Sequence, residues 1–142
     1  MKMLPIASDG WRFIIPLTAG GLLLLLFRTW WLTGLGGIVL LLGLFSLFFF
    51  RDFERSAPRD DSLLYGPGDG RVLAVETVSD EHGQSRRVIR IFLSVFDVHV
   101  QRAPMSGTVE KITYRKGRFW DARDERAHVE NEQNTILIRN AK

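Results

Sequence analysis

Two long runs without a charged residue lie within the first 50 residues of this 142-residue chain, and they constrain its fold more than any other feature. The run from Phe13 to Phe27 contains 15 residues, and the run from Trp30 to Phe50 contains 21. At about 1.5 Å per residue, a helix over the second run is roughly 31 Å long, enough to cross a hydrocarbon core of about 30 Å. A helix over the first run reaches only about 22 Å, so it either spans a thinned bilayer or enters the bilayer and returns.

The residues at the ends of these runs favour a hairpin. Arg28 and Thr29 separate the runs, and the pair Trp30–Trp31 begins the second one, where a turn at the membrane interface takes a cation and aromatic anchors. Basic residues also stand on both outer flanks: Lys2, Arg12, Arg51, Arg55 and Arg59. By the positive-inside rule both flanks are cytoplasmic. The sequence therefore predicts an N-terminal transmembrane or monotopic helical hairpin over residues 1–50, in the cell membrane, with the rest of the chain on the cytoplasmic side.

The remainder of the chain has a different composition. It holds 31 of the 35 charged residues, which excludes both a purely soluble globule and a disordered tail protein for the whole chain. The absence of cysteine excludes disulfides, cysteine zinc sites and thiol nucleophiles. Basic and acidic residues alternate here, so the net charge of +3 indicates no nucleic-acid partner. We expect Arg51, Arg55 and Arg59 to bind anionic lipid head groups instead.

A small mainly-β domain is predicted to follow a charged linker over residues 51–62. Alternation with period two predicts four strands, at Arg71–Val78, Arg87–Leu93, Thr108–Tyr114 and Thr135–Arg139. Segment 121–133 is charged and lacks an apolar stripe, which predicts an exposed loop or a short turn of helix. The last strand stops close to Lys142, so we expect the domain over residues 63–142 to be incomplete at its C-terminal edge and to be completed by a missing segment or another chain.

Three histidines are the candidates for acid–base chemistry. His82 and His128 lie in polar loops, which favours solvated side chains. His99 follows an apolar strand, so it either points into a cleft or packs as a structural histidine, and the spacing leaves both open. Asp69 lies in a Gly-Pro-Gly-Asp-Gly segment that lacks the Gly-Lys-Ser/Thr ending of a phosphate loop, and an ordinary turn explains it as well. No metal-ligand spacing is present, and no metal is expected.

Four groups of residues, in unbroken order, carry a resemblance to a known family. They are Phe49–Arg55 after the leucine-rich hairpin, Gly66–Arg71, the run Ile91–Pro104 followed by Ser106–Val109, and Asn131–Thr135. Together they resemble the short type of phosphatidylserine decarboxylase proenzyme over essentially the whole chain. The Asp-Val-His-Val segment with Arg-Ala-Pro behind it is the most specific part. Two small departures are Phe53, where the family usually has proline, and Gln101, where asparagine is common.

The resemblance implies a pyruvoyl-dependent lyase that makes phosphatidylethanolamine from phosphatidylserine in the membrane. A serine in a Gly-Ser bond near the C-terminus would become a pyruvoyl group at the start of a separate, smaller subunit, and that group would serve as the electron sink. The resemblance implies that His99 donates the proton that replaces carbon dioxide. It implies that Asp69 assists self-cleavage or orients the histidine. The resemblance identifies no residues that would hold the cofactor. It leaves open whether the protein forms a homo-oligomer. The implied fold is a barrel-sandwich-like partial catalytic domain over residues 63–142.

The chain departs from this family at one decisive point. None of its thirteen glycines precedes a serine, so the cleavage bond is absent, and we expect the chain alone to be inactive. The main alternative is a membrane-anchored β-barrel scaffold without catalytic activity. A biotinyl or lipoyl carrier fits poorly, because Lys111 lies within a predicted strand and Lys116 stands between Arg115 and Gly117.

Overall fold

The structure is a computed structural model that describes residues 5–56, 58, 60, 62–79 and 83–140. Its described residues form two compact units. The first unit contains the chain up to Ser56 together with Gly68–Gly70 and Leu93–Gln101, and the second contains all four strands. Arg59, one of the expected lipid ligands, and His82 lie outside the described residues.

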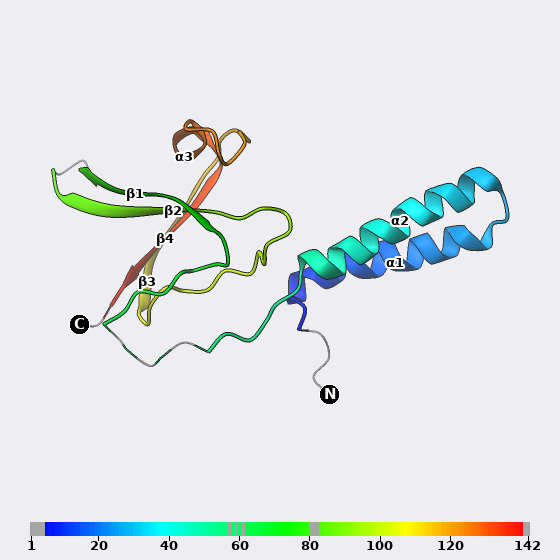
Figure 1. Cartoon of the computed structure of the whole chain (residues 1–142), viewed down its shortest axis with the longest axis horizontal. Coiled ribbons are helices and arrows are strands. Elements are labelled where there is room, and N and C mark those ends of the chain that lie inside the picture. Colours follow the sequence, from blue (N-terminus) through cyan, green and yellow to red (C-terminus); the bar gives the residue numbers. More distant parts are fainter. Residues whose placement is uncertain (1–4, 57, 59, 61, 80–82, 141–142) are drawn as a thin grey trace. The chain divides into compact units, whose positions relative to one another are not determined.

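The first unit is built on a helical hairpin, as the uncharged runs predict (Figure 1). A short 3₁₀ turn at Ser8–Gly10 leads into α1 (Trp11–Leu26), and α2 (Trp30–Phe49) returns beside it. By length and composition, two helical stretches could cross a membrane: Ser8–Leu26, which joins the 3₁₀ turn to α1, and α2. The prediction of two apolar N-terminal helices is therefore confirmed.

Glycines bring the two helices close together. A Cβ added to Gly21 of α1 would lie 2.6 Å from the backbone nitrogen of Leu40, and one added to Gly43 of α2 would lie 2.7 Å from Cγ2 of Thr18. Large apolar side chains point outward instead: Leu26 is 75% exposed and Trp30 is 86% exposed. Small residues between helices and large apolar residues outside are typical of helices packed in lipid.

The two ends of the hairpin are joined by backbone hydrogen bonds. The Ala7 amide donates to the Phe50 carbonyl at 2.9 Å, and the Asp52 amide donates to the Pro5 carbonyl at 2.6 Å. These bonds flank an antiparallel bridge between Ile6 and Arg51. The segments that enter and leave the hairpin therefore meet at the same end of the two helices.

The second unit contains two antiparallel two-stranded sheets (Figure 1). In one, β1 (Arg71–Ser79) pairs with β2 (Ser85–Phe92), and in the other β3 (Thr108–Arg115) pairs with β4 (Gln133–Arg139). All four predicted strands are confirmed within two residues at each end. The barrel-sandwich-like arrangement stays a prediction, because the described strands pair as two separate sheets. A short helix, α3 (Ala127–Glu130), precedes β4 and contains the buried Ala127.

The loop between β3 and β4 is ordered around Trp120. The Trp120 amide donates to Oδ1 of Asn131 at 2.7 Å, and Nδ2 of Asn131 donates to the Trp120 carbonyl at 2.8 Å. The Arg126 guanidinium lies 3.8 Å from the centre of the indole ring, where a cation is attracted to the aromatic face. Asn131, the first residue of the Asn131–Thr135 motif, therefore holds a loop in place.

Candidate functional site

The loop Leu93–Gln101 carries His99 and belongs to the same compact unit as the hairpin. A tight turn forms its first half: the Ser94 amide donates to a carboxylate oxygen of Asp97 at 2.7 Å, and the Asp97 amide donates back to the Ser94 carbonyl at 2.9 Å. Val98 is buried, with 6% of its surface exposed. The turn and the buried valine fix the backbone on the N-terminal side of His99.

The Asp97 carboxylate is the main charged group of this turn. Its pKa lies below the ordinary value, chiefly because the Ser94 amide and hydroxyl donate hydrogen bonds to the charged form. Electrostatic interaction with the neighbouring His99 and Arg51 side chains lowers that pKa by a smaller amount. The carboxylate therefore stays ionised at neutral pH and holds the turn closed.

The imidazole of His99 is half-buried and has two defined partners. It stacks on the ring of Phe49, with the ring centres 4.3 Å apart and 28° between the planes. Its Nδ1 lies 3.1 Å from the Asp97 carbonyl oxygen. Because a carbonyl only accepts hydrogen bonds, Nδ1 carries a proton, and Nε2 is the nitrogen left for chemistry.

Arg51 connects the end of α2 with the His99 loop. Its guanidinium donates to the Phe48 carbonyl at 2.7 Å and to the Phe96 carbonyl at 2.6 Å. It also lies 3.9 Å from the centre of the Phe48 ring. Arg51, which the sequence suggested as a lipid ligand, thus has two backbone partners that hold the loop against the helix.

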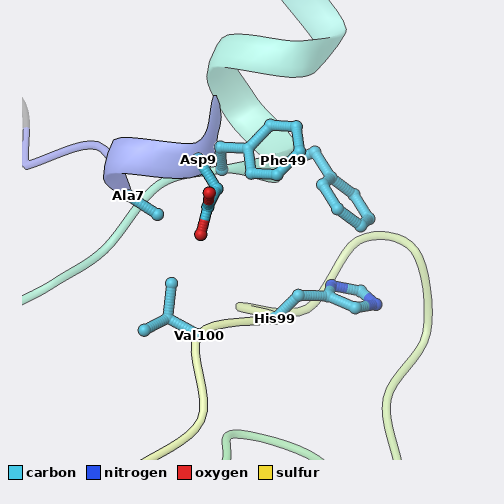
Figure 2. Close-up of a pocket in the computed structure, with 6 residues that line it drawn as sticks. Ala7, Asp9, Phe49, His99 and Val100 are labelled. Carbon is cyan, nitrogen blue, oxygen red and sulfur yellow. The ribbon is translucent and has the colours of Figure 1, made fainter. Parts of the chain in front are cut away.

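A pocket of about 250 Å³ opens beside His99 (Figure 2). Figure 2 shows Ala7 and Asp9 on one side of this pocket and His99 and Val100 facing them. Two phenyl rings, those of Phe49 and Phe50, also line it. The pocket is therefore mostly apolar, with one carboxylate and one imidazole as its polar groups.

Asp69 lies in the same unit but has a different partner. Its carboxylate forms an ion pair with Arg55, and both side chains are partly exposed. The neighbouring Gly68 lies near Leu93 and Gln101, so the Gly68–Gly70 segment reaches the His99 loop. Among the described residues, no direct contact joins Asp69 to His99, and no group of three acidic, histidine or cysteine side chains is placed to hold a metal ion.

Of the residues that line the pocket, only His99 was predicted from the sequence as a site residue; the others are Ala7, Asp9, Phe49, Phe50 and Val100. Asp9 is one of only four charged residues in the first 50, which was the available signal. Nothing in the spacing connects residue 9 with residue 99, since the two line one pocket only in the folded unit.

The comparisons with known proteins give one family. The sequence model described as phosphatidylserine decarboxylase matches residues 42–142. The phosphatidylserine decarboxylase proenzyme of Citrifermentans bemidjiense is 41% identical over 141 residues, which is 96% of this chain and 64% of that protein. The proenzyme of Trichlorobacter lovleyi is 48% identical over 101 residues, 71% of this chain and 46% of that protein. The proenzyme of Ralstonia nicotianae is 37% identical over 139 residues, 96% of this chain and 62% of that protein.

No solved structure matches the chain. The relatives that match nearly the whole of this chain are longer than it is. The match covers slightly less than two thirds of their length, 64% for the Citrifermentans protein.

Proposed function

Because the chain belongs to the phosphatidylserine decarboxylase family, we propose that it forms most of an enzyme that converts phosphatidylserine to phosphatidylethanolamine. In this reaction the carboxylate of the serine head group leaves as carbon dioxide, and a proton takes its place on the same carbon. The observation that carries the proposal is a half-buried histidine, His99, in a pocket at the open end of an apolar hairpin.

We assign the proton to His99. Nδ1 is engaged by the Asp97 carbonyl, so a second proton on the ring resides on Nε2. Stacking on Phe49 and the turn closed by Asp97 restrict the ring to one orientation. A general acid that is held in place in this way typically contributes about 10²–10⁴-fold to a rate.

Asp69 is proposed to act in maturation or in orienting the site. Its ion pair with Arg55 ties the Gly68–Gly70 segment to the chain that leaves the hairpin. Arg51, Arg55 and Arg59 follow the hairpin directly, and we keep them as proposed contacts for anionic lipid head groups, although Arg51 and Arg55 also have protein partners.

The hairpin is proposed to insert into the cell membrane with its open end on the cytoplasmic side. The exposed leucines and tryptophans would otherwise present a large apolar surface to water, which soluble proteins avoid. Since the pocket residues 7, 9, 49 and 50 stand at the open end of the hairpin, they would lie at the depth of the lipid head groups.

Enzymes of this family use a pyruvoyl group, which accepts electrons as carbon dioxide leaves. The residues of this chain do not supply its precursor, because none of the thirteen glycines precedes a serine. The complete enzyme would need a second segment that carries it.

The proposal is tested by restoring that segment. Residues 1–142 would be purified alone and also joined to, or mixed with, the part of a relative that lies outside the matched region. The chain alone is expected to release no carbon dioxide from phosphatidylserine, and the completed enzyme is expected to release it. Release by the chain alone would refute the pyruvoyl assignment, and an inert but correctly cleaved complete enzyme would favour the scaffold alternative.

A further inference from the structure

Arg51 stands where α2 meets the His99 loop, and both of its terminal nitrogens have backbone acceptors. Nη1 donates to the Phe48 carbonyl in the last turn of α2, and Nη2 donates to the Phe96 carbonyl in the loop Leu93–Gln101. The Phe48 ring, whose centre lies 3.9 Å from the guanidinium carbon, adds a third contact. The guanidinium therefore joins two segments of the same unit that are far apart in the sequence.

The carbonyl that Arg51 holds is one peptide group away from the carbonyl that holds His99. The Asp97 carbonyl oxygen lies 3.1 Å from Nδ1 of His99. Because peptide groups are planar, only the φ and ψ angles of Asp97 separate the Phe96 carbonyl from the Asp97 carbonyl. The hydrogen bonds between Asp97 and Ser94 restrict those two angles. A displacement of the Phe96 carbonyl would therefore be passed on to the acceptor of the imidazole.

Arg51 also supports the aromatic partner of the imidazole. Phe49, which stacks on His99 with 4.3 Å between the ring centres (Figure 2), is the last residue of α2 and lies two positions before Arg51. The last carbonyls of a helix carry a partial negative charge, so a cation that binds one of them stabilises the final turn. The same side chain thus holds the helix end that bears Phe49 and the loop that bears His99.

We propose that Arg51 is a positioning residue, whose guanidinium sets the orientation of the His99 ring by holding the Phe96 carbonyl against the end of α2. The inference rests on the proposed function, since the orientation of this ring matters for catalysis only if His99 delivers the proton. An arginine is required because its rigid fork presents one nitrogen to each carbonyl, whereas lysine offers a single nitrogen. The hairpin then helps to form the site as well as anchoring the chain.

The orientation of the ring is measured on residues 1–142 in detergent micelles and needs no turnover. In the proton NMR spectrum, the ring current of Phe49 should displace the ring signals of His99 to high field, and F49L shows their position without it. The signals of His99 are those absent from H99A, and the other two histidines of the chain are internal references. R51K keeps the positive charge without the fork, and R51A removes both.

Arg12 provides the matched control. It is an arginine in the first turn of α1, in the same unit, and it pairs with Asp9 and lies 5.1 Å from the centre of the Phe13 ring. R12A therefore removes an arginine with an aromatic partner from the other flank of the hairpin, while both hydrogen bonds of Arg51 stay in place.

We expect R51A and R51K to lose most of the high-field displacement, so that their His99 signals approach those of F49L, and we expect R12A to keep it. Helix content measured by circular dichroism shows that each variant is folded, and R51K carries the test if R51A is not. A full wild-type displacement in R51K, an equal loss in R12A, or identical signals in the wild type and F49L would overturn the inference.

In an active complete enzyme, R51K is expected to lower kcat by about 10–10²-fold with little change in KM, because a small misplacement of a catalytic group costs up to about that much. A role confined to binding lipid would instead raise KM in R51A, leave kcat unchanged and be served equally well by lysine, and that result would contradict the proposal. An inert complete enzyme would count against the proposed function, whereas the NMR comparison on residues 1–142 would still decide the role of Arg51.

Discussion

Replacing Gly21 with alanine is expected to force the two helices of the hairpin apart. The new Cβ would lie 2.6 Å from the backbone nitrogen of Leu40 and 2.8 Å from its Cα, whereas non-bonded carbon atoms prefer about 3.5–4.0 Å. Backbone atoms cannot rotate away as the end of a side chain can. One helix must therefore shift by about 1 Å, and overpacking of this kind typically costs about 1–3 kcal/mol.

Gly20 provides a matched control in the same helix. A Cβ at Gly20 meets nothing within 4 Å, so G20A changes only the helix propensity. Both variants gain the same propensity, about 1 kcal/mol, and the difference between them isolates the contact with Leu40. We expect G21A to be about 1–3 kcal/mol less stable than G20A.

The assay is unfolding of the hairpin in mixed micelles by rising mole fractions of dodecyl sulfate, followed by circular dichroism. A third variant, G43A, places its Cβ 2.7 Å from Thr18 and should also be less stable than G20A. If G21A and G20A unfold at the same mole fraction, the close glycine packing of α1 on α2 is refuted.

The remaining predictions concern topology and pH. Because the chain has no cysteine, a single cysteine introduced as K2C or as S85C reports on which side of the membrane that position lies. Both cysteines should resist a membrane-impermeant thiol reagent in intact cells. Labelling of only one of them would mean that the chain crosses the membrane once. The pKa of Asp97 is lowered in the folded chain from an ordinary value of 3.8, so its stabilising effect is complete above about pH 4 and is lost as the pH falls through the lowered pKa. The protection of the Leu93–Gln101 amides from hydrogen exchange, measured against the intrinsic exchange rate at the same pH, should therefore fall at acid pH in the wild type. A wild-type protection as insensitive to acid as that of D97N would contradict this.

The helices and strands could be predicted because each depends on a pattern local in the sequence. The uncharged runs begin and end within two residues of α1 and α2, and the first turn of α1, which begins at Trp11, includes the charged Arg12. The alternation in residues 71–78 and 108–114 reflects strands in two-stranded sheets, and the turn at 127–130 falls in the segment predicted to be a loop or a short helix.

The candidate site could be predicted only in part. His99 was identified because its position after an apolar strand and its motif are visible in the chain. Its surroundings were not, because Phe49, which stacks on it, is 50 positions away, and Asp9, which lines the same pocket, is 90 positions away. Arg51 was interpreted as a lipid ligand because it follows an apolar run. Its hydrogen bond to the Phe96 carbonyl joins residues 45 positions apart, and no local pattern in the sequence indicates it.

The central claim is that His99 supplies the proton in decarboxylation, and turnover of the completed enzyme tests it most directly. Carbon dioxide release from phosphatidylserine would be measured for the wild type, for H99A and for H128A, which removes an exposed histidine from the loop between β3 and β4. H99A is expected to lower the rate by about 10²–10⁴-fold, with membrane association and self-cleavage unchanged, while H128A stays near the wild type. Unchanged turnover in H99A would make His99 a packing residue for Phe49 and contradict the account.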